Sequence, residues 1–312
     1  MADLQDRYSL IIIGSGPAGL TASIYASRFK IDNLVVGQAL GGLAFEAHKI
    51  CNFPTETEIS GMDLVTKMQQ HVEDSGAKIL IDKVIEIEAI SQDEFKLTTQ
   101  MGKTFLASAI LLATGTEHRH LNLANEDKLL GKGISYCATC DAMFYRGKTV
   151  AVVGGGNSAH TASLYLAEVA KKVYQIYRGD TLKGEQVWID QLKNHKNIEI
   201  LYKTQLTDLK GDSKLEAIVL DKQYQGKKEL VVDGLFVEIG TVPQSDLIDQ
   251  LELKTDDSGY VLVGADQKSS RDRVWVAGDI TTNSNSFRQV ITACSEGAVA
   301  SASIFKFLQQ SK

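Results

Sequence analysis

The stretch YSLIIIGSGPAGLTASIYASRF, residues 8–29, joins an apolar run to a glycine-rich turn and then to a run of small and apolar residues. The first run predicts a buried strand and the last run predicts a helix. Between them, Gly14 permits a tight turn, Gly16 lets a pyrophosphate approach the backbone, and Gly19 allows close packing of helix on strand. The N-terminus of such a helix offers free N–H groups and positive potential. The stretch therefore predicts a dinucleotide-binding βαβ unit.

The same pattern returns in KTVAVVGGGNSAHTASLYLAEVA, residues 148–170. Here Gly154, Gly156 and Ala159 fit the spacing G-x-G-x-x-A between a second apolar run and a second helical run. One such turn is weak evidence, but two in one chain form an internal repeat. Together they predict two nucleotide sites on two doubly wound α/β domains.

The residues after each predicted strand bear on which nucleotide is bound, because an acid there suits a free ribose 2′-hydroxyl and cations suit a 2′-phosphate. After the second turn, KKVYQIYRGDTLKGE places Arg178 and Lys183 near the strand end. Two interpretations stand equal: a phosphate-binding pair, or a solvated surface pair. After the first turn, Gly37 and Gln38 occupy the position expected for the acid.

The length of 312 residues exceeds what one hydrophobic core normally serves. Buried strands are predicted to end at Gly115 and Gly240, where the chain can cross between domains. The last strand, RVWV, leads into Gly278 and a final helix, and this unit needs a sheet to join. We therefore expect one domain of residues 1–115 and 246–312, with a second domain, 116–245, inserted in it.

Composition excludes some partners. The net charge is −6, with 44% apolar and 23% charged residues, and this balance lacks the basic excess that nucleic-acid binding needs. The N-terminal MADLQDRYSL has no basic start of a secretory signal, and no run reaches the length of an uninterrupted apolar membrane helix. The sequence predicts a cytoplasmic protein with no nucleic-acid or membrane partner.

Four cysteines occur, and two of them form the pair C-x-x-C in CATCD, with Cys137 and Cys140 followed at once by Asp141. No second pair stands at ligand spacing, so no metal site is predicted. A lone C-x-x-C in a reducing cytosol favours redox chemistry. Asp141 then suits an acid/base role, with a helix cap as its alternative. Cys51 and Cys294 are expected to be small buried side chains.

Eight motifs stand in the order seen in the low-molecular-weight thioredoxin reductases, which are class II members of the FAD-dependent pyridine nucleotide-disulfide oxidoreductase superfamily. They are GSGPAG at 14–19, GG at 41–42, Asn52, ATG at 113–115, CATCD at 137–141, GGGNSA at 154–159, GD at 278–279 and RQV at 288–290. The chain resembles this family over nearly its whole length. The resemblance implies two Rossmann-like, three-layer ββα domains and a homodimer.

The resemblance also implies site residues. FAD would be bound by the first turn and later segments: Gly14, Ser15, Gly16, Pro17, Ala18, Gly19, Gly41, Gly42, Leu43, Asn52, Ala113, Thr114, Gly115, Gly278, Asp279, Arg288, Gln289 and Val290. NADPH or NADH, the donor, would be bound by Gly154, Gly155, Gly156, Asn157, Ser158, Ala159, Arg178 and Lys183. Cys140 would take electrons from the flavin, and Cys137 would attack the disulfide of thioredoxin or a similar protein. In this family, rotation about the two domain crossings alternates nicotinamide and dithiol at the flavin.

The chain departs from the family at the nicotinamide site. NADPH-using members have a His-Arg-Arg stretch followed by another Arg, whereas this sequence has Tyr177, Arg178, Gly179 and, further on, Lys183. An ammonium keeps the charge of a guanidinium but loses its bidentate geometry. A thioredoxin reductase fed by ferredoxin or by another flavin is therefore an alternative. A flavoprotein that senses redox state without turnover is a second one.

Overall fold

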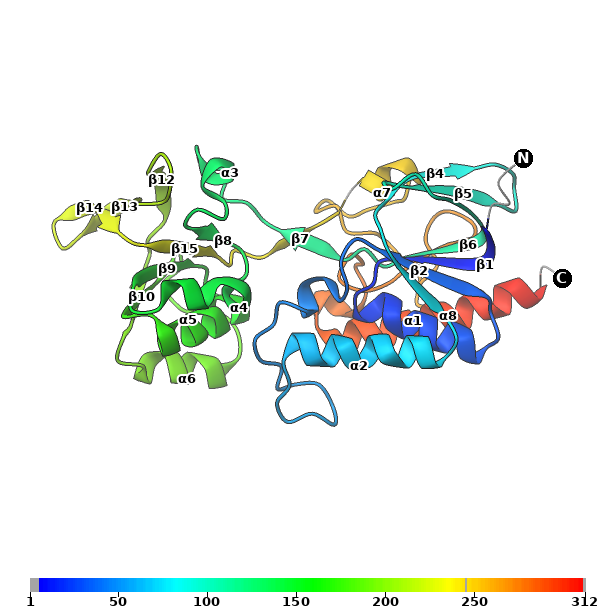
Figure 1. Ribbon diagram of the computed structural model, residues 1–312, viewed down its shortest axis with the longest axis horizontal. Coiled ribbons are helices and arrows are strands. Elements are labelled where there is room, and N and C mark those ends of the chain that lie inside the picture. Colours follow the sequence, from blue (N-terminus) through cyan, green and yellow to red (C-terminus); the bar gives the residue numbers. More distant parts are fainter. Residues whose placement is uncertain (1–5, 245, 311–312) are drawn as a thin grey trace. The chain divides into compact units, whose positions relative to one another are not determined.

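The computed structural model describes residues 6–244 and 246–310. The chain divides into two compact units, and each is described by itself (Figure 1). Unit 1 comprises Met1–Glu117 and Val242–Lys312, and unit 2 comprises His118–Thr241. Two short strands at the crossings, β7 (Thr116–His118) and β16 (Thr241–Pro243), pair with each other.

Unit 1 is built on a mixed seven-stranded sheet in the order β3-β2-β1-β6-β5-β4, with β17 also paired to β6. Its strands are β1 (Asp6–Ile13), β2 (Asn33–Gly37), β3 (Lys78–Ile81), β4 (Val84–Ala89), β5 (Phe95–Thr99), β6 (Thr104–Leu112) and β17 (Val274–Val276). The strands β1, β2, β3, β6 and β17 run parallel to one another, and β4 and β5 extend the sheet with antiparallel pairing beyond β6. Because β17 pairs with β6, the C-terminal segment returns to the sheet that the N-terminal segment began.

Both faces of this sheet are covered, which explains why β1 is apolar without alternation. Leu10 and Ile12 lie in one cluster with the helices α1 and α8, while Ile11 and Ile13 lie in another with β4, β5 and α7. Figure 1 shows α1 and α8 side by side. The helices of unit 1 are α1 (Pro17–Arg28), α2 (Gly61–Asp74), α7 (Asp246–Gln250) and α8 (Val290–Gln310), with the 3-10 turns η1 (Gly42–Ala44) and η3 (Ser284–Ser286).

Unit 2 repeats the three-layer plan. Its five-stranded parallel sheet has the order β11-β10-β9-β15-β8, and a three-stranded antiparallel sheet, β12-β13-β14, covers one face. Helices cover the other face, where α5 packs on Val150 and Val152. The elements are β8 (Ile134–Ser135), β9 (Thr149–Val153), β10 (Lys172–Tyr177), β11 (Ile198–Tyr202), β12 (Leu206–Lys210), β13 (Ala217–Tyr224), β14 (Lys227–Val231), β15 (Gly234–Val237), α3 (Glu126–Leu129), α4 (Ala138–Asp141), η2 (Ala142–Tyr145), α5 (Asn157–Val169) and α6 (Gln186–Asn194).

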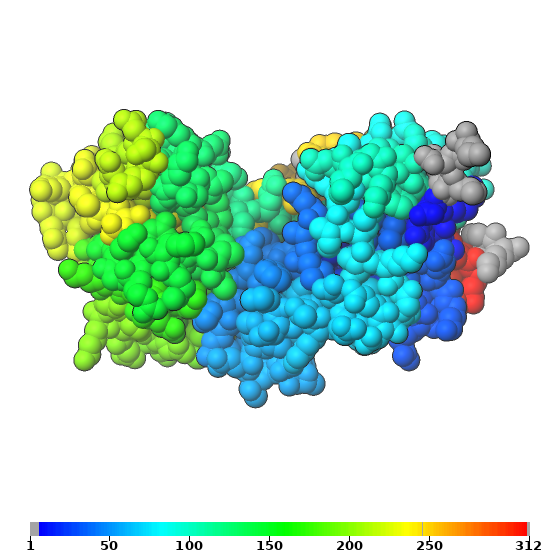
Figure 2. Space-filling view, in the orientation of Figure 1, coloured from blue at the N-terminus to red at the C-terminus, as the bar shows by residue number. Residues whose placement is uncertain are grey.

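One described helix, α8, has the length and composition of a membrane span. It packs along α1, and its buried face includes the charged Glu296 as well as Ala300 and Ile304. Figure 2 shows the amphipathic α2 at the surface of unit 1 in that view. One face of α8 therefore contributes to the core of unit 1. The predicted α/β fold class, with two doubly wound units, is confirmed.

Candidate functional site

The first glycine turn connects β1 to α1 and touches the end of β6. A Cβ at position 14 would lie 2.1 Å from the carbonyl oxygen of Ala113, and a Cβ at position 19 would lie 1.9 Å from that of Gly14. Neither position has room for a side chain. At Gly16 the nearest atom to a Cβ is 3.8 Å away, so the space in front of the helix stays open. Gly16 is the N-cap of α1 and has no capping side chain, so the first N–H groups of the helix face that space.

The segment after β2 folds against this turn. The buried Ser15 donates its hydroxyl to the carbonyl of Ala39 at 2.8 Å, and Gly41 donates its N–H to the carbonyl of Ser15 at 2.8 Å. A Cβ at position 37 would lie 2.2 Å from Ser15 Oγ. Glycine therefore stands at the position expected for an acid because Ser15 fills the space that a side chain would need. Gly42 and Leu43 follow in η1.

The C-terminal motifs meet the same turn. A Cβ at Gly278, whose φ is +89°, would lie 2.9 Å from the Cβ of Ala18 in α1. Arg288 Nε donates to the carbonyl of Asp279 at 3.1 Å. Asn52, far away in sequence, donates to Gln289 Oε1 at 3.0 Å, immediately before α8 begins at Val290. Unit 1 thus brings together the segments that the sequence proposed for FAD.

Two acids lie at the turn after β17: Asp279 within the turn, and Glu296, which reaches it from α8. The sequence analysis had identified only Asp279. Burial raises the pKa of Asp279 to about 6, Arg288 opposes that rise, and the charge of Glu296 adds to it. Glu296 accepts hydrogen bonds from the Gly278 N–H at 2.9 Å, from Thr281 at 2.8 Å and from Ser284 at 2.6 Å. A lone acid in the small-residue run ACSEGAVAS was the available signal for it. Glu296 holds the loop that carries Asp279.

The residues of unit 1 fit an anionic dinucleotide. The Oγ1 atom of Thr114, in the predicted ATG motif, is buried and has no hydrogen-bond partner among the described residues. It lies next in sequence to Ala113, which the first glycine turn contacts. A buried hydroxyl of this kind normally has a partner. The unpaired Thr114 hydroxyl and the uncapped N-terminus of α1 are both features that a bound FAD would satisfy.

The second glycine turn joins β9 to α5 in unit 2. Gly154 donates its N–H to the carbonyl of Ile176 at 2.9 Å, and a Cβ at this position would lie 2.1 Å from the carbonyl oxygen of Glu238. Gly156 is the N-cap of α5, again without a capping side chain, and has open space around it. Ala159 is buried against the sheet, and Asn157 and Ser158 begin the helix. Arg178 and Lys183 are both exposed after β10.

Cys137 and Cys140 form a disulfide at the start of α4. Cys140 is exposed and Cys137 is partly exposed, so the sulfurs are open to reaction. The Cys140 N–H donates to Cys137 Sγ at 3.1 Å. The buried Ser135 fixes Cys137, because its hydroxyl accepts from the Cys137 N–H at 3.0 Å and donates to its carbonyl at 3.2 Å. Asp141 ends α4, and its side chain makes no capping hydrogen bond to η2, so the alternative of a helix cap finds no support.

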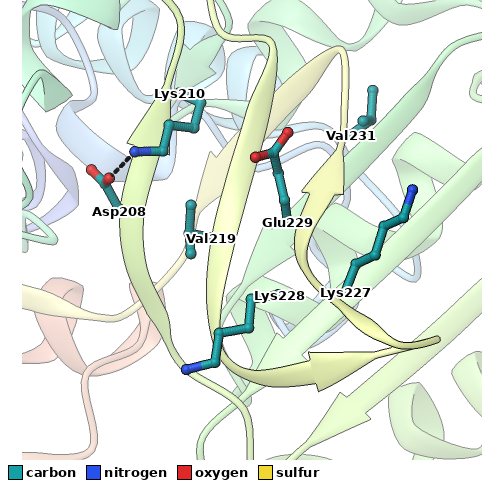
Figure 3. A pocket seen from close by; sticks show the side chains of 7 residues that line it. All are labelled: Asp208, Lys210, Val219, Lys227, Lys228, Glu229 and Val231. Atoms are coloured by element: carbon teal, nitrogen blue, oxygen red, sulfur yellow. Dashed lines mark hydrogen bonds and ion pairs between the residues drawn. The ribbon is translucent and has the colours of Figure 1, made fainter.

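Other features lie outside this arrangement. A shallow pocket of about 550 Å³ on β12, β13 and β14 contains none of the predicted site residues (Figure 3). Its lining is Asp208, Lys210, Val219, Lys227, Lys228, Glu229 and Val231. Within residues 6–244 and 246–310 no group of three or more metal-ligating side chains is found. The expectation for Cys51 was wrong: it is exposed on an irregular loop, and Cys294 is half-buried.

Comparison with known proteins places the chain in a family. Residues 8–297 match the pyridine nucleotide-disulphide oxidoreductase family. The thioredoxin reductase of Listeria innocua is 34% identical over 100% of this chain and 97% of its own length. The thioredoxin reductase structures of Lactococcus lactis and T. acidophilum superpose with TM-scores of 0.91 and 0.90, each at 30% identity, covering 97% and 98% of this chain and 99% and 100% of theirs. The chain therefore belongs to the pyridine nucleotide-disulphide oxidoreductase family and, within it, to the low-molecular-weight thioredoxin reductases.

Proposed function

We propose that this protein is an FAD-dependent disulfide reductase that passes electrons from NADPH or NADH, through the Cys137–Cys140 disulfide, to thioredoxin or a similar protein. The observation that carries the proposal is the accessible disulfide followed by Asp141, in the same unit as the second glycine turn. The similarity to thioredoxin reductases over the whole chain does not favour the two alternatives, a ferredoxin- or flavin-fed enzyme and a redox sensor.

FAD would be held in unit 1. Its pyrophosphate would lie at Gly16 and the N-terminus of α1, where backbone N–H groups are free, and Thr114 and Asp279 would bind its hydroxyl groups. Asn52 and Gln289, already hydrogen bonded to each other, would border the ring. When bound, FAD would supply a two-electron carrier, which can accept a hydride from the nicotinamide and pass two electrons to a disulfide.

The thiol chemistry of this chain then follows from its two sulfurs. Reduction of the disulfide takes up two electrons and two protons and gives two thiols. The Cys137 thiolate attacks one sulfur of the partner disulfide, breaks that S–S bond and forms a mixed disulfide. Cys140 attacks Cys137 Sγ, which restores the internal disulfide and releases the partner as a dithiol. Asp141 is proposed to move the protons, and the Cys140 N–H, which donates to Cys137 Sγ in the disulfide, would stabilise the Cys137 thiolate.

The donor would bind to unit 2. The open backbone at Gly156 and the uncapped N-terminus of α5 suit a pyrophosphate, and Arg178 and Lys183 suit a 2′-phosphate. The cytoplasmic location and the homodimer stay predictions, and sedimentation of the purified protein tests the second.

The test is reduction of thioredoxin disulfide by the FAD-loaded protein with NADPH, NADH or reduced ferredoxin as the only donor, followed by counting the thiols released. We expect turnover with at least one nicotinamide nucleotide. Turnover with reduced ferredoxin alone would overturn the choice of donor, and no thiol release with any donor would overturn the proposed reaction.

A further inference from the structure

A chain of buried polar side chains in unit 2 connects the second glycine turn to the segment that carries Lys183. His160, in α5, and Gln175, in β10, are both fully buried. Gln175 Nε2 lies 3.1 Å from the carbonyl oxygen of Gly154 and 3.0 Å from His160 Nδ1. His160 Nε2 lies 2.7 Å from the carbonyl oxygen of Lys183. The proposed function gives no role to either side chain.

The partners fix the direction of each hydrogen bond. A carbonyl oxygen only accepts, so His160 carries its proton on Nε2 and donates to Lys183. His160 Nδ1 is then an acceptor, which matches the amide NH₂ of Gln175, and the second proton of that NH₂ reaches Gly154. The neutral imidazole is the form that burial favours. The links run in one continuous series from the turn to the Lys183 segment.

The segment from Arg178 to Glu185 is also held by backbone contacts. The Lys183 N–H donates to the carbonyl of Gly155 at 2.8 Å, and the Glu185 N–H donates to Asn157 Oδ1 at 2.8 Å. At the other end, Lys203 donates its N–H to the carbonyl of Gly179 at 2.9 Å. The charged ends of Arg178 and Lys183 stay exposed while the backbone beneath them is fixed.

We propose that His160 and Gln175 are positioning residues for the nicotinamide nucleotide, which set its 2′-phosphate specificity by holding the Lys183 segment against the second glycine turn. The inference rests on the proposed use of a nicotinamide donor. A lysine recognises a phosphate as a point charge without the planar geometry of arginine, so its selectivity depends on where its backbone is held. Binding also orders the loop that carries these side chains, and a backbone that is already fixed reduces this cost.

The experiment measures the Kd of NADPH and of NADH for the FAD-loaded protein by calorimetry. His160→Leu fills the same space with an apolar side chain and removes the hydrogen bonds to Lys183 and Gln175. Gln175→Leu removes the hydrogen bonds to His160 and Gly154. His160→Gln is the rescue variant, because its amide can still donate to Lys183. Ser163→Ala is the matched control, since Ser163 is also buried in α5 and its hydroxyl has no partner among the described residues.

We expect His160→Leu and Gln175→Leu to raise the Kd of NADPH about tenfold, which is the ratio expected for a lost charged or buried hydrogen bond. The Kd of NADH should rise by a smaller factor. His160→Gln should recover most of the affinity, and Ser163→Ala should change neither Kd. Amide hydrogen exchange at 181–185 should accelerate in the two leucine variants, while FAD content stays unchanged.

Three results overturn the inference, and they differ in what else they overturn. If the wild type binds neither nucleotide, the nicotinamide donor fails together with this role. If the wild type binds NADPH and His160→Leu binds it as Ser163→Ala does, only the positioning role fails. If both nucleotides weaken equally, the buried chain does not set 2′-phosphate specificity.

Discussion

Asp279→Asn should stabilise the flavin-free protein and weaken FAD binding at the same time. The Asp279 side chain is half-buried, and desolvation together with the charge of Glu296 raises its pKa from 3.8 to about 6. A group whose pKa is raised on folding stabilises the fold fully only below its unfolded pKa, and this contribution is lost as the pH rises through the folded pKa. The ionised Asp279 therefore destabilises the protein at neutral pH, and an amide removes that ionisation.

The size of the effect follows from the two pKa values. The rise of the Asp279 pKa from 3.8 to about 6 lowers the free energy of unfolding by up to about 3 kcal/mol at pH 8. At pH 5, where Asp279 is mostly protonated in the folded protein, it lowers that free energy by about 1.6 kcal/mol. Asp279→Asn should thus gain about 1.4 kcal/mol relative to wild type between pH 5 and pH 8. For FAD the expected change is at least about tenfold weaker binding, because a charge-assisted hydrogen bond is lost.

The assay is urea unfolding of flavin-free wild type and variant at pH 5 and pH 8, with FAD affinity measured separately by fluorescence quenching. Thr282→Val is a control, because it changes a partly buried hydroxyl in the same loop without changing a charge. The reasoning is refuted if the variant is no more stable than wild type at pH 8, or if its advantage does not grow with pH. Unchanged FAD affinity would refute the assignment of Asp279 to the cofactor.

Three further predictions concern other parts of the two sites. Gly19→Ala should destabilise the protein by more than about 2 kcal/mol because its Cβ meets backbone, whereas Gly16→Ala should fold normally yet bind FAD more weakly; equal unfolding midpoints for the two would contradict this. Removing Arg178 and Lys183 together should raise the KM for NADPH several-fold and that for NADH less, and equal rises would make them ordinary surface charges. Burial lowers the pKa of His160, so its contribution to stability is present above about pH 6.5 and is lost as the pH falls; His160→Leu should reduce this acid sensitivity in urea unfolding, and an unchanged pH profile would contradict it.

The fold could be predicted from the sequence because glycine spacing and apolar runs are local signals. The turn at Gly14 and the turn at Gly154 each stand between a strand and a helix, as their spacing required. The return of β17 to β6 also followed, because a strand ending in Gly278 needs a sheet to join. The order of motifs then identified the family, which the comparisons confirm.

Contacts between distant residues could not be predicted in the same way. Gly37 is explained by Ser15, which approaches it only after β2 pairs with β1. Glu296 reaches Gly278 across a loop, and a lone acid in a helix does not reveal which N–H groups it will accept from. Cys51 was wrongly expected to be buried because a free cysteine usually packs as a small apolar residue, whereas here it lies on an exposed loop.

The most direct test of the central claim compares Cys137→Ser with wild type, both loaded with FAD. The account predicts that, in an anaerobic titration with dithionite, each wild-type molecule takes up two electrons more than each variant molecule. Only wild type has the Cys137–Cys140 disulfide, which accepts two electrons when it is reduced. It also predicts that the variant's flavin is still bleached by the nicotinamide donor while its reduction of thioredoxin disulfide is lost. Equal electron uptake, or thioredoxin reduction by the variant at the wild-type rate, would contradict the claim that electrons leave through this disulfide.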